Sequence, residues 1–90
     1  MLEKTIEDYL RKEVTKVGGY CMKWVSPSNR GVPDRILILP KGRVVFVELK
    51  QKGKKLDPLQ KYFRKKFVAL DQEHYVVDSK ESADRLVRLL

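Results

Sequence analysis

Apolar residues recur along this chain in blocks whose spacing is helical in some segments and extended in others. The first block repeats at steps of three and four residues, which predicts a helix over residues 2–17. A glycine pair at 18–19 follows directly, as glycines commonly do after the last turn of a helix. The apolar positions of this helix are Ile6, Leu10, Val14 and Val17.

Short runs of β-branched and aliphatic residues predict four strands. Between the first two runs lies a segment, 26–32, that is rich in turn-forming residues. A Pro-Lys-Gly turn at 40–42 joins the second run to the third, so these two are expected to form a β-hairpin. The predicted strands cover residues 20–25, 36–39, 43–47 and 73–77.

Two further helices are expected in the second half of the chain. One opens at Asp57, a favourable N-cap residue, with Pro58 at the first helical position. The other begins near Asp78 or Ser79. The residues expected to be buried are Leu59, Phe63, Phe67 and Leu70 in the former helix and Ala83, Leu86, Val87 and Leu90 in the latter.

The element order α-β-β-β-α-β-α places the chain in the α/β class, with a mixed four-stranded sheet flanked by helices. Residues 1–90 contain no internal repeat, linker or low-complexity tract, so a single domain is expected. A domain of this length buries only a modest core.

Composition narrows the choice of partner. Lysine and arginine outnumber aspartate and glutamate 20 to 12, which gives a formal charge of +8 and favours a polyanion such as nucleic acid. A membrane surface is the other reading, but no apolar stretch approaches the about 20 residues of a spanning helix. Charged residues interrupt the N-terminus, unlike a signal peptide.

Cysteine usage agrees with a cytoplasmic location. The single cysteine, Cys21, excludes an internal disulfide framework and fits a reducing compartment. With His74 as the only histidine, a zinc site within one chain is improbable. We expect Cys21 to be a small buried hydrophobe within a strand.

The predicted hairpin brings two acids and one lysine together. Asp34 precedes its first strand, and Glu48 and Lys50, two residues apart, follow its second strand on one face. Burying carboxylates at the end of an apolar sheet is unfavourable unless a partner compensates their charge. Hard cations such as Mg²⁺ prefer oxygen ligands. The pattern therefore indicates Mg²⁺ or Mn²⁺ held by Asp34, Glu48 and the Leu49 backbone carbonyl, an arrangement suited to phosphodiester hydrolysis.

Purely structural roles for these three residues also stay open. A Glu-x-Lys triplet and a Pro-Asp turn are each common by chance. In the alternative interpretation, Glu48 and Lys50 form a solvated strand end and Asp34 pairs with an arginine. The joint placement of all three residues on one hairpin favours the metal site. Lys50 then either orients the attacking water or stabilises charge in the transition state.

Three segments resemble the VRR-NUC (virus-type replication-repair nuclease) domain of the PD-(D/E)xK nuclease superfamily. They are GVPD at 31–34, FVELK at 46–50 and LDPLQ at 56–60, in the order typical of that family. The resemblance extends from Glu7 to about Val77.

The resemblance implies a metal-dependent endonuclease acting on branched or flapped DNA, without a nucleotide cofactor. It also implies phage or bacterial origin, action in the host cytoplasm, and a homodimer similar to Holliday junction resolvases. The residue roles carried over are metal binding for Asp34 and Glu48, catalysis for Lys50, a helix-borne acid at Glu7 that assists metal binding and catalysis, and a helix-borne site residue at Gln60. Glu7 is otherwise an ordinary solvated acid, and Gln60 is otherwise a partner of Asp57 in a capping box.

The substrate surface is expected on the basic loop that follows the second hairpin strand. Its alternative is a solvated loop that aids solubility. The residues expected to contact nucleic acid are Arg30, Lys52, Lys54, Lys55 and Lys61. Most aromatic residues are expected in the core rather than on a stacking surface; they are Tyr20, Trp24, Phe46, Tyr62, Phe63, Phe67 and Tyr75.

Two other functions remain possible from the sequence. The same fold with a degenerate site would be a catalytically inactive nucleic-acid-binding module, and a small basic structural protein would use its acids only to pair with lysines. A C2 homodimer is expected because a four-way junction presents two equivalent strands. Candidate interfaces are the first helix, the first strand and the end formed by Leu86, Leu89 and Leu90.

Overall fold

The computed structural model describes residues 2–90, so the part of the predicted domain at Met1 lies outside the described residues. Within them, three helices and four strands follow the predicted order. The elements are α1 (Glu3–Lys16), β1 (Tyr20–Lys23), β2 (Arg35–Ile38), the 3-10 turn η1 (Pro40–Gly42), β3 (Val44–Leu49), α2 (Pro58–Ala69), β4 (Glu73–Val77) and α3 (Lys80–Leu89).

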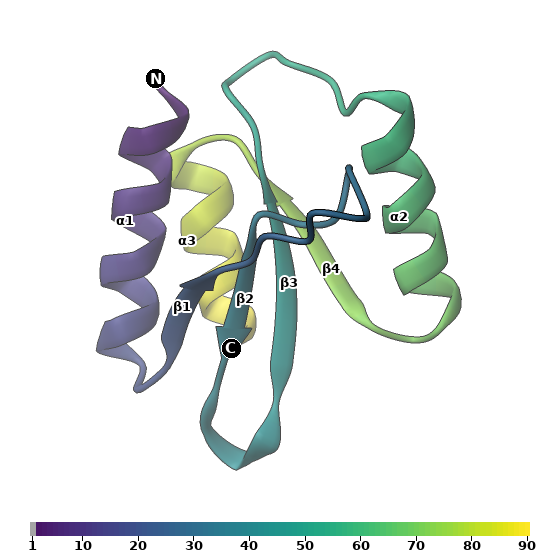
Figure 1. The fold of residues 1–90 in the computed structure, drawn as a ribbon. Coiled ribbons are helices and arrows are strands. Elements are labelled where there is room, and N and C mark those ends of the chain that lie inside the picture. The colour runs from purple at the N-terminus through teal and green to yellow at the C-terminus, as the bar shows by residue number, and fades with distance from the viewer. Residues whose placement is uncertain (1) are drawn as a thin grey trace.

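The strands form one mixed sheet in the order β1-β2-β3-β4 (Figure 1). Strands β1, β2 and β3 are antiparallel, while β4 lies parallel to β3. A parallel pair needs a crossover connection, and α2 supplies it. Because Arg35 pairs with Val47 and Ile38 with Val44, the start of β2 lies beside the end of β3, as the sequence predicted.

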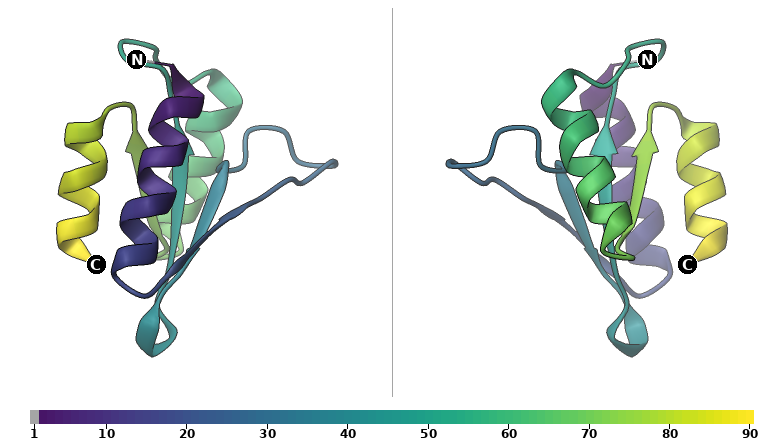
Figure 2. Two further views of the ribbon diagram at one scale, coloured as in Figure 1. Left: turned by 90° about the vertical axis from the view of Figure 1, so that its left-hand side faces the viewer. Right: turned by 90° about the vertical axis from the view of Figure 1, so that its right-hand side faces the viewer.

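Helices α1 and α3 cover one face of the sheet and form the main core with it (Figure 2). Alternate strand residues point to this face, among them Cys21, which is buried as expected. Val17 was expected in the buried stripe of α1 but is exposed, because the helix ends at Lys16. The buried residues of this core are Ile6, Leu10, Val14, Cys21, Leu37, Leu39, Val45, Val47, Leu49, Val77, Ala83 and Leu86.

Helix α2 packs on the opposite face through a small aromatic cluster. Phe67 lies 4.8 Å from Phe46 and 6.0 Å from Trp24, measured between ring centroids. Beneath it, His74 is buried, and burial lowers the pKa of its imidazole to about 4, which identifies it as a neutral core residue near pH 7.

The predicted apolar stripe of α2 is wrong at both ends. Leu59 and Leu70 are 46% and 70% exposed, whereas Phe63 and Phe67 are half-buried. Helix α2 has no fully buried residue, and its apolar side chains are at most half-buried where it packs on the sheet.

No helix within residues 2–90 has both the length and the apolar character needed to cross a bilayer.

Candidate functional site

Asp34 is held at the start of β2 by main-chain contacts on two sides. Its carboxylate Oδ2 accepts a hydrogen bond of 2.8 Å from the backbone N–H of Leu49 at the end of β3. Its own carbonyl accepts one of 2.9 Å from the N–H of Trp24, which continues the β1–β2 pairing. The Asp34 side chain therefore connects the two strands of the hairpin at the predicted place.

Glu48 is a buried acid near the end of β3. It is 1% exposed, and neither carboxylate oxygen has a hydrogen-bond partner within them. Burial, followed by the negative charge of Asp34, raises the pKa of Glu48 to about 8 against the opposing effect of the Lys50 ammonium. Burying an ionised carboxylate without a partner is strongly unfavourable. Such a group is typically neutralised by a bound cation or by a proton.

Asp34 shares this environment. Burial also raises the pKa of the Asp34 carboxyl, while the Leu49 N–H and the Lys50 ammonium lower it. The two carboxylates thus repel each other in a partly buried site, and the Lys50 ammonium attracts both of them. The predicted meeting of Asp34, Glu48 and Lys50 is what the structure contains.

Glu7 lies on α1 and makes a salt bridge with Arg35 rather than standing free. The Arg35 guanidinium donates to the Glu7 carboxylate and, at 3.3 Å, to the carbonyl of Cys21. Both side chains are substantially covered, so the pair fixes α1 over the sheet directly beside Asp34. No arginine within residues 2–90 makes a salt bridge with Asp34, and Arg35 binds Glu7 instead.

The sequence did not single out Arg35 or Glu3 for this neighbourhood. Glu3 lies in the first turn of α1. Partial burial and the charge of Asp34 raise its pKa, with Lys50 acting in the opposite direction. Glu3 stands four residues before Glu7, and this one-turn spacing was the only available signal.

Gln60 forms a capping box with Asp57, which is the structural role that the sequence predicted as the alternative to a role in the site. Its side-chain oxygen accepts from the Asp57 N–H at 2.9 Å, and the Asp57 carboxylate accepts from the Gln60 N–H at 2.9 Å. Its capping role is confirmed, and a direct part for Gln60 in the site stays a prediction.

At Gly31, the loop that carries Asp34 packs closely against the start of α2. Gly31 has a φ of +94°, and an added Cβ would lie 2.7 Å from the backbone carbon of Leu59. A larger residue would therefore force the loop away from α2. The close approach places the N-terminus of α2 beside the GVPD segment, next to the buried Pro33.

The five basic residues predicted to contact nucleic acid are all exposed, and none makes a salt bridge with the rest of residues 2–90. Lys52, Lys54 and Lys55 lie in the loop between β3 and α2, and Lys61 lies in the first turns of that helix. Their position, directly after the strand that carries Glu48, suits a path for a charged backbone.

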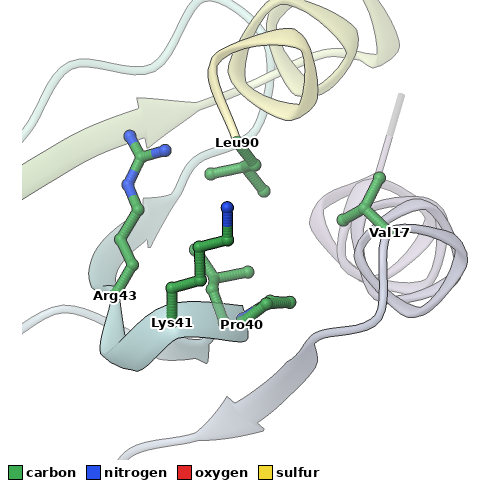
Figure 3. Close-up of a pocket in the computed structure, with 6 residues that line it drawn as sticks. Val17, Pro40, Lys41, Arg43 and Leu90 are labelled. Atoms are coloured by element: carbon green, nitrogen blue, oxygen red, sulfur yellow. The ribbon is translucent and has the colours of Figure 1, made fainter.

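A hollow of about 420 Å³ lies at the other end of the hairpin, around η1 (Figure 3). None of its lining side chains is acidic. Arg43, at its edge, is held by Glu73 through contacts of 2.6 and 2.7 Å and by the Leu89 carbonyl at 2.7 Å. This hollow is separate from the carboxylate site.

Residues 2–90 do not supply a complete set of side-chain ligands for a metal ion. Among the described residues, no three His, Cys, Asp or Glu side chains are grouped closely enough to hold an ion by themselves. Mg²⁺ is commonly bound by only one or two carboxylates, with waters and substrate oxygens completing its shell. The orphaned Glu48 carboxylate beside Asp34 fits such a cation, and the Leu49 carbonyl remains a candidate third ligand.

Comparison with known proteins agrees with this geometry. The chain is 44% identical over 79 residues to "Putative nuclease p44" of Acyrthosiphon pisum secondary endosymbiont phage 1, which covers 88% of this chain and 85% of that protein. A solved structure described as "VRR_NUC domain" superposes with a TM-score of 0.90 at 30% identity and covers 96% of this chain and 94% of that one. No family model matches the sequence.

The fold is that of a PD-(D/E)xK-type nuclease domain. The chain belongs to the VRR-NUC family, as its three sequence segments predicted.

The buried carboxylate gives a prediction for stability in the absence of metal. The folded pKa of Glu48 is about 8, above the ordinary value of 4.5, so between these values the folded state holds a proton that the unfolded state has lost. The free energy of unfolding therefore falls as pH rises through this window. Glu48→Gln, which carries no titrating proton, removes that contribution.

Urea unfolding of both proteins in EDTA at pH 5, 7 and 9 measures the effect. The variant should gain stability relative to the parent by more than about 1.4 kcal/mol, the equivalent of one pKa unit, between the lowest and highest pH. His74 contributes the opposite slope below its unfolded pKa, but equally in both proteins. Parallel pH profiles would contradict the burial of a titrating Glu48.

Proposed function

We propose that this protein is a Mg²⁺- or Mn²⁺-dependent endonuclease that hydrolyses phosphodiester bonds in structured or branched DNA. The observation that carries the proposal is the buried Glu48 carboxylate, which has no hydrogen-bond partner within residues 2–90 and lies beside Asp34 at the end of the hairpin. A structural role leaves this unpartnered acid unexplained, whereas a cation-binding role accounts for it.

Each residue of the site has a defined task in this proposal. Asp34 and Glu48 hold the cation, and the Leu49 N–H keeps the Asp34 carboxylate oriented while its second oxygen stays free. A bound divalent ion would supply Lewis acidity and a more acidic water. Lys50, which acts electrostatically on both acids, orients that water or stabilises negative charge on the phosphate oxygens.

Glu7 and Gln60 support the site from the two flanking helices. Glu7 is proposed to assist the metal-bound water or the ion from α1, with Arg35 fixing its position. Gln60 is proposed to use the amide nitrogen that its cap leaves available toward the water or a phosphate, since the cap engages the amide oxygen.

The basic loop is proposed as the path of the DNA backbone. Lys52, Lys54 and Lys55 follow the catalytic strand directly, with Lys61 and Arg30 on the two segments joined by the Gly31 contact. Because these contacts are to phosphates, they position the strand without reading its sequence, and binding should weaken steeply as salt increases. Recognition of DNA shape is therefore the proposed basis of selectivity.

A homodimer is proposed to form through the uncovered part of the sheet. Tyr20, Ile38 and Val44 are paired neighbours on three adjacent strands and are 72%, 41% and 37% exposed, with Met22 beside them. This row contains no charge, although two copies of a chain with a net charge of +8 repel each other elsewhere. An exposed apolar row on a sheet is typical of a protein interface.

A C2 dimer would provide two sites for the two equivalent strands of a junction. The similar protein is a putative nuclease from a phage, and we propose that this chain likewise acts in the cytoplasm of a host cell.

Cleavage of a labelled four-way junction, a flap and a matched linear duplex tests the activity. With Mg²⁺ or Mn²⁺ the protein should cut a branched substrate in preference to the duplex, and EDTA should abolish cutting. Glu48→Gln should lower the cleavage rate by at least about a hundredfold while binding survives, because only the carboxylate is removed.

Asp71→Asn is the matched control, since it also removes one carboxylate but lies at the turn after α2 with a φ of 60° that asparagine tolerates. Retained cleavage in Glu48→Gln would disprove the site assignment. Tight, salt-sensitive binding by the unmodified protein without any cutting would instead favour the inactive binding module.

Substitution of the apolar row tests the dimer. Ile38→Lys introduces a charge at its centre and should convert the dimer to a monomer in sedimentation equilibrium. Leu89→Lys changes an exposed leucine of α3, at the other candidate interface, and should leave the dimer intact. A dimer that survives the first change and is lost with the second would move the interface to α3.

A further inference from the structure

Tyr62 is an exposed aromatic residue on the helix that begins at the site. The sequence placed it with the core aromatics, but the structure leaves it 52% exposed on the outer side of α2. Its neighbours Phe63 and Phe67 occupy the inner side, where they are half-buried. Packing therefore does not account for an aromatic residue at position 62.

The Tyr62 ring is held in place by its neighbours. It meets the Phe63 ring edge-on, with 5.2 Å between centroids and an angle of 85°, and Phe63 is itself half-buried. The Lys66 ammonium lies 5.5 Å from the Tyr62 ring centroid, in a cation–π arrangement. A flat ring with restricted motion loses little freedom when a second ring stacks on it.

Beside this ring is a surface hollow of about 340 Å³, lined by Tyr62, Lys65, Lys66 and Ala69. The small side chain of Ala69 leaves the space open, and the two lysines provide cations at its edge. An aromatic face combined with ammonium groups is the chemistry that binds an unpaired nucleotide, because the base stacks on the ring and the phosphate pairs with lysine. Lys66 is flexible enough to move from the ring to that phosphate.

The charge of this helix distinguishes among possible ligands. Lys61, Arg64, Lys65 and Lys66 make the surface around Tyr62 strongly cationic, and no acidic residue lies within α2. An apolar protein segment would gain the ring contact but leave these charges unused. A single-stranded nucleic acid satisfies both the ring and the cations.

The position of Tyr62 relates the hollow to the carboxylate site. Helix α2 starts against the GVPD loop at Leu59, and Tyr62 follows Gln60 by two residues, about 3 Å along the helix axis and on a different side of the helix. A strand that crosses the basic loop toward Asp34 and Glu48 passes this helix end. A nucleotide stacked on Tyr62 then belongs to the same DNA molecule as the scissile phosphate.

We propose that Tyr62, with Lys65 and Lys66, forms a stacking subsite for an unpaired nucleobase. The subsite gives the enzyme additional affinity for branched DNA that carries a single-stranded segment beside the cut, such as a flap, over a fully paired duplex. This inference rests on the proposed nuclease function for its biological meaning, but the binding of the base does not depend on cleavage.

Binding in EDTA tests the subsite without catalysis. The probes are a flap DNA carrying a fluorescent adenine analogue in its single-stranded segment and a fully paired duplex of the same sequence. Tyr62→Ala should weaken flap binding by about tenfold and leave duplex binding within about twofold, since stacking on one aromatic residue has this magnitude. The unmodified protein should quench the analogue, and Tyr62→Ala should not.

Three further variants make the test specific. Tyr62→Phe keeps the ring and should retain flap affinity and quenching, whereas Tyr62→Leu keeps an apolar side chain without a flat face and should lose both. Leu70→Ala removes an exposed apolar group at the opposite end of α2, just after its last residue, and should change neither. Equal losses on flap and duplex, or no loss with Tyr62→Ala, would overturn the subsite.

The outcomes separate this inference from the proposed function. Stacking that depends on Tyr62 in a protein that never cuts with Mg²⁺ or Mn²⁺ would support the subsite and remove the nuclease proposal. Metal-dependent cutting with the same flap preference in Tyr62→Ala would overturn the subsite and leave the nuclease proposal standing.

Discussion

The hydrogen bond from the Leu49 N–H to the Asp34 carboxylate, at 2.8 Å, joins the two ends of the hairpin where the chemistry is placed. This bond places the Asp34 carboxylate beside Glu48. The buried Glu48 carboxylate has no comparable hydrogen bond within the described residues. Folding therefore retains an unfavourable pair of carboxylates. Such local frustration in an otherwise consistent fold is typical of a functional site.

The rest of the fold keeps this pair in place from three sides. The β2–β3 register fixes Asp34 opposite the end of β3, and the Glu7–Arg35 pair fastens α1 above it. The contact between Gly31 and Leu59 brings the start of α2 to the same edge of the sheet. Each contact joins segments far apart in the chain, so the site depends on the whole fold rather than on one loop.

Much of this arrangement was accessible from local sequence pattern. The Pro-Lys-Gly turn and the two flanking apolar runs sufficed to place Asp34 near Glu48, because hairpin geometry is set locally. Asp57, Pro58 and Gln60 likewise predicted the start of α2 and its capping box, which the structure contains.

What the sequence left out depends on tertiary contacts. Helical periodicity marked Leu59 and Leu70 as core, but it does not reveal how deeply a helix is buried against the sheet. Arg35 was one of many basic residues, and its pairing with Glu7 requires the packing of α1 on β2. The exposure of Tyr62 and the orphaned state of Glu48 were equally invisible, since both are decided by which neighbours surround them.

Calorimetric titration of Mn²⁺ into the metal-free protein tests the central claim, that Asp34 and Glu48 together form a cation site. The unmodified protein and Asp71→Asn should bind the ion with the same affinity, and Glu48→Gln and Asp34→Asn should each lose that binding. Equal Mn²⁺ binding by all four proteins would contradict the account, because the buried carboxylates would then have no part in holding the metal.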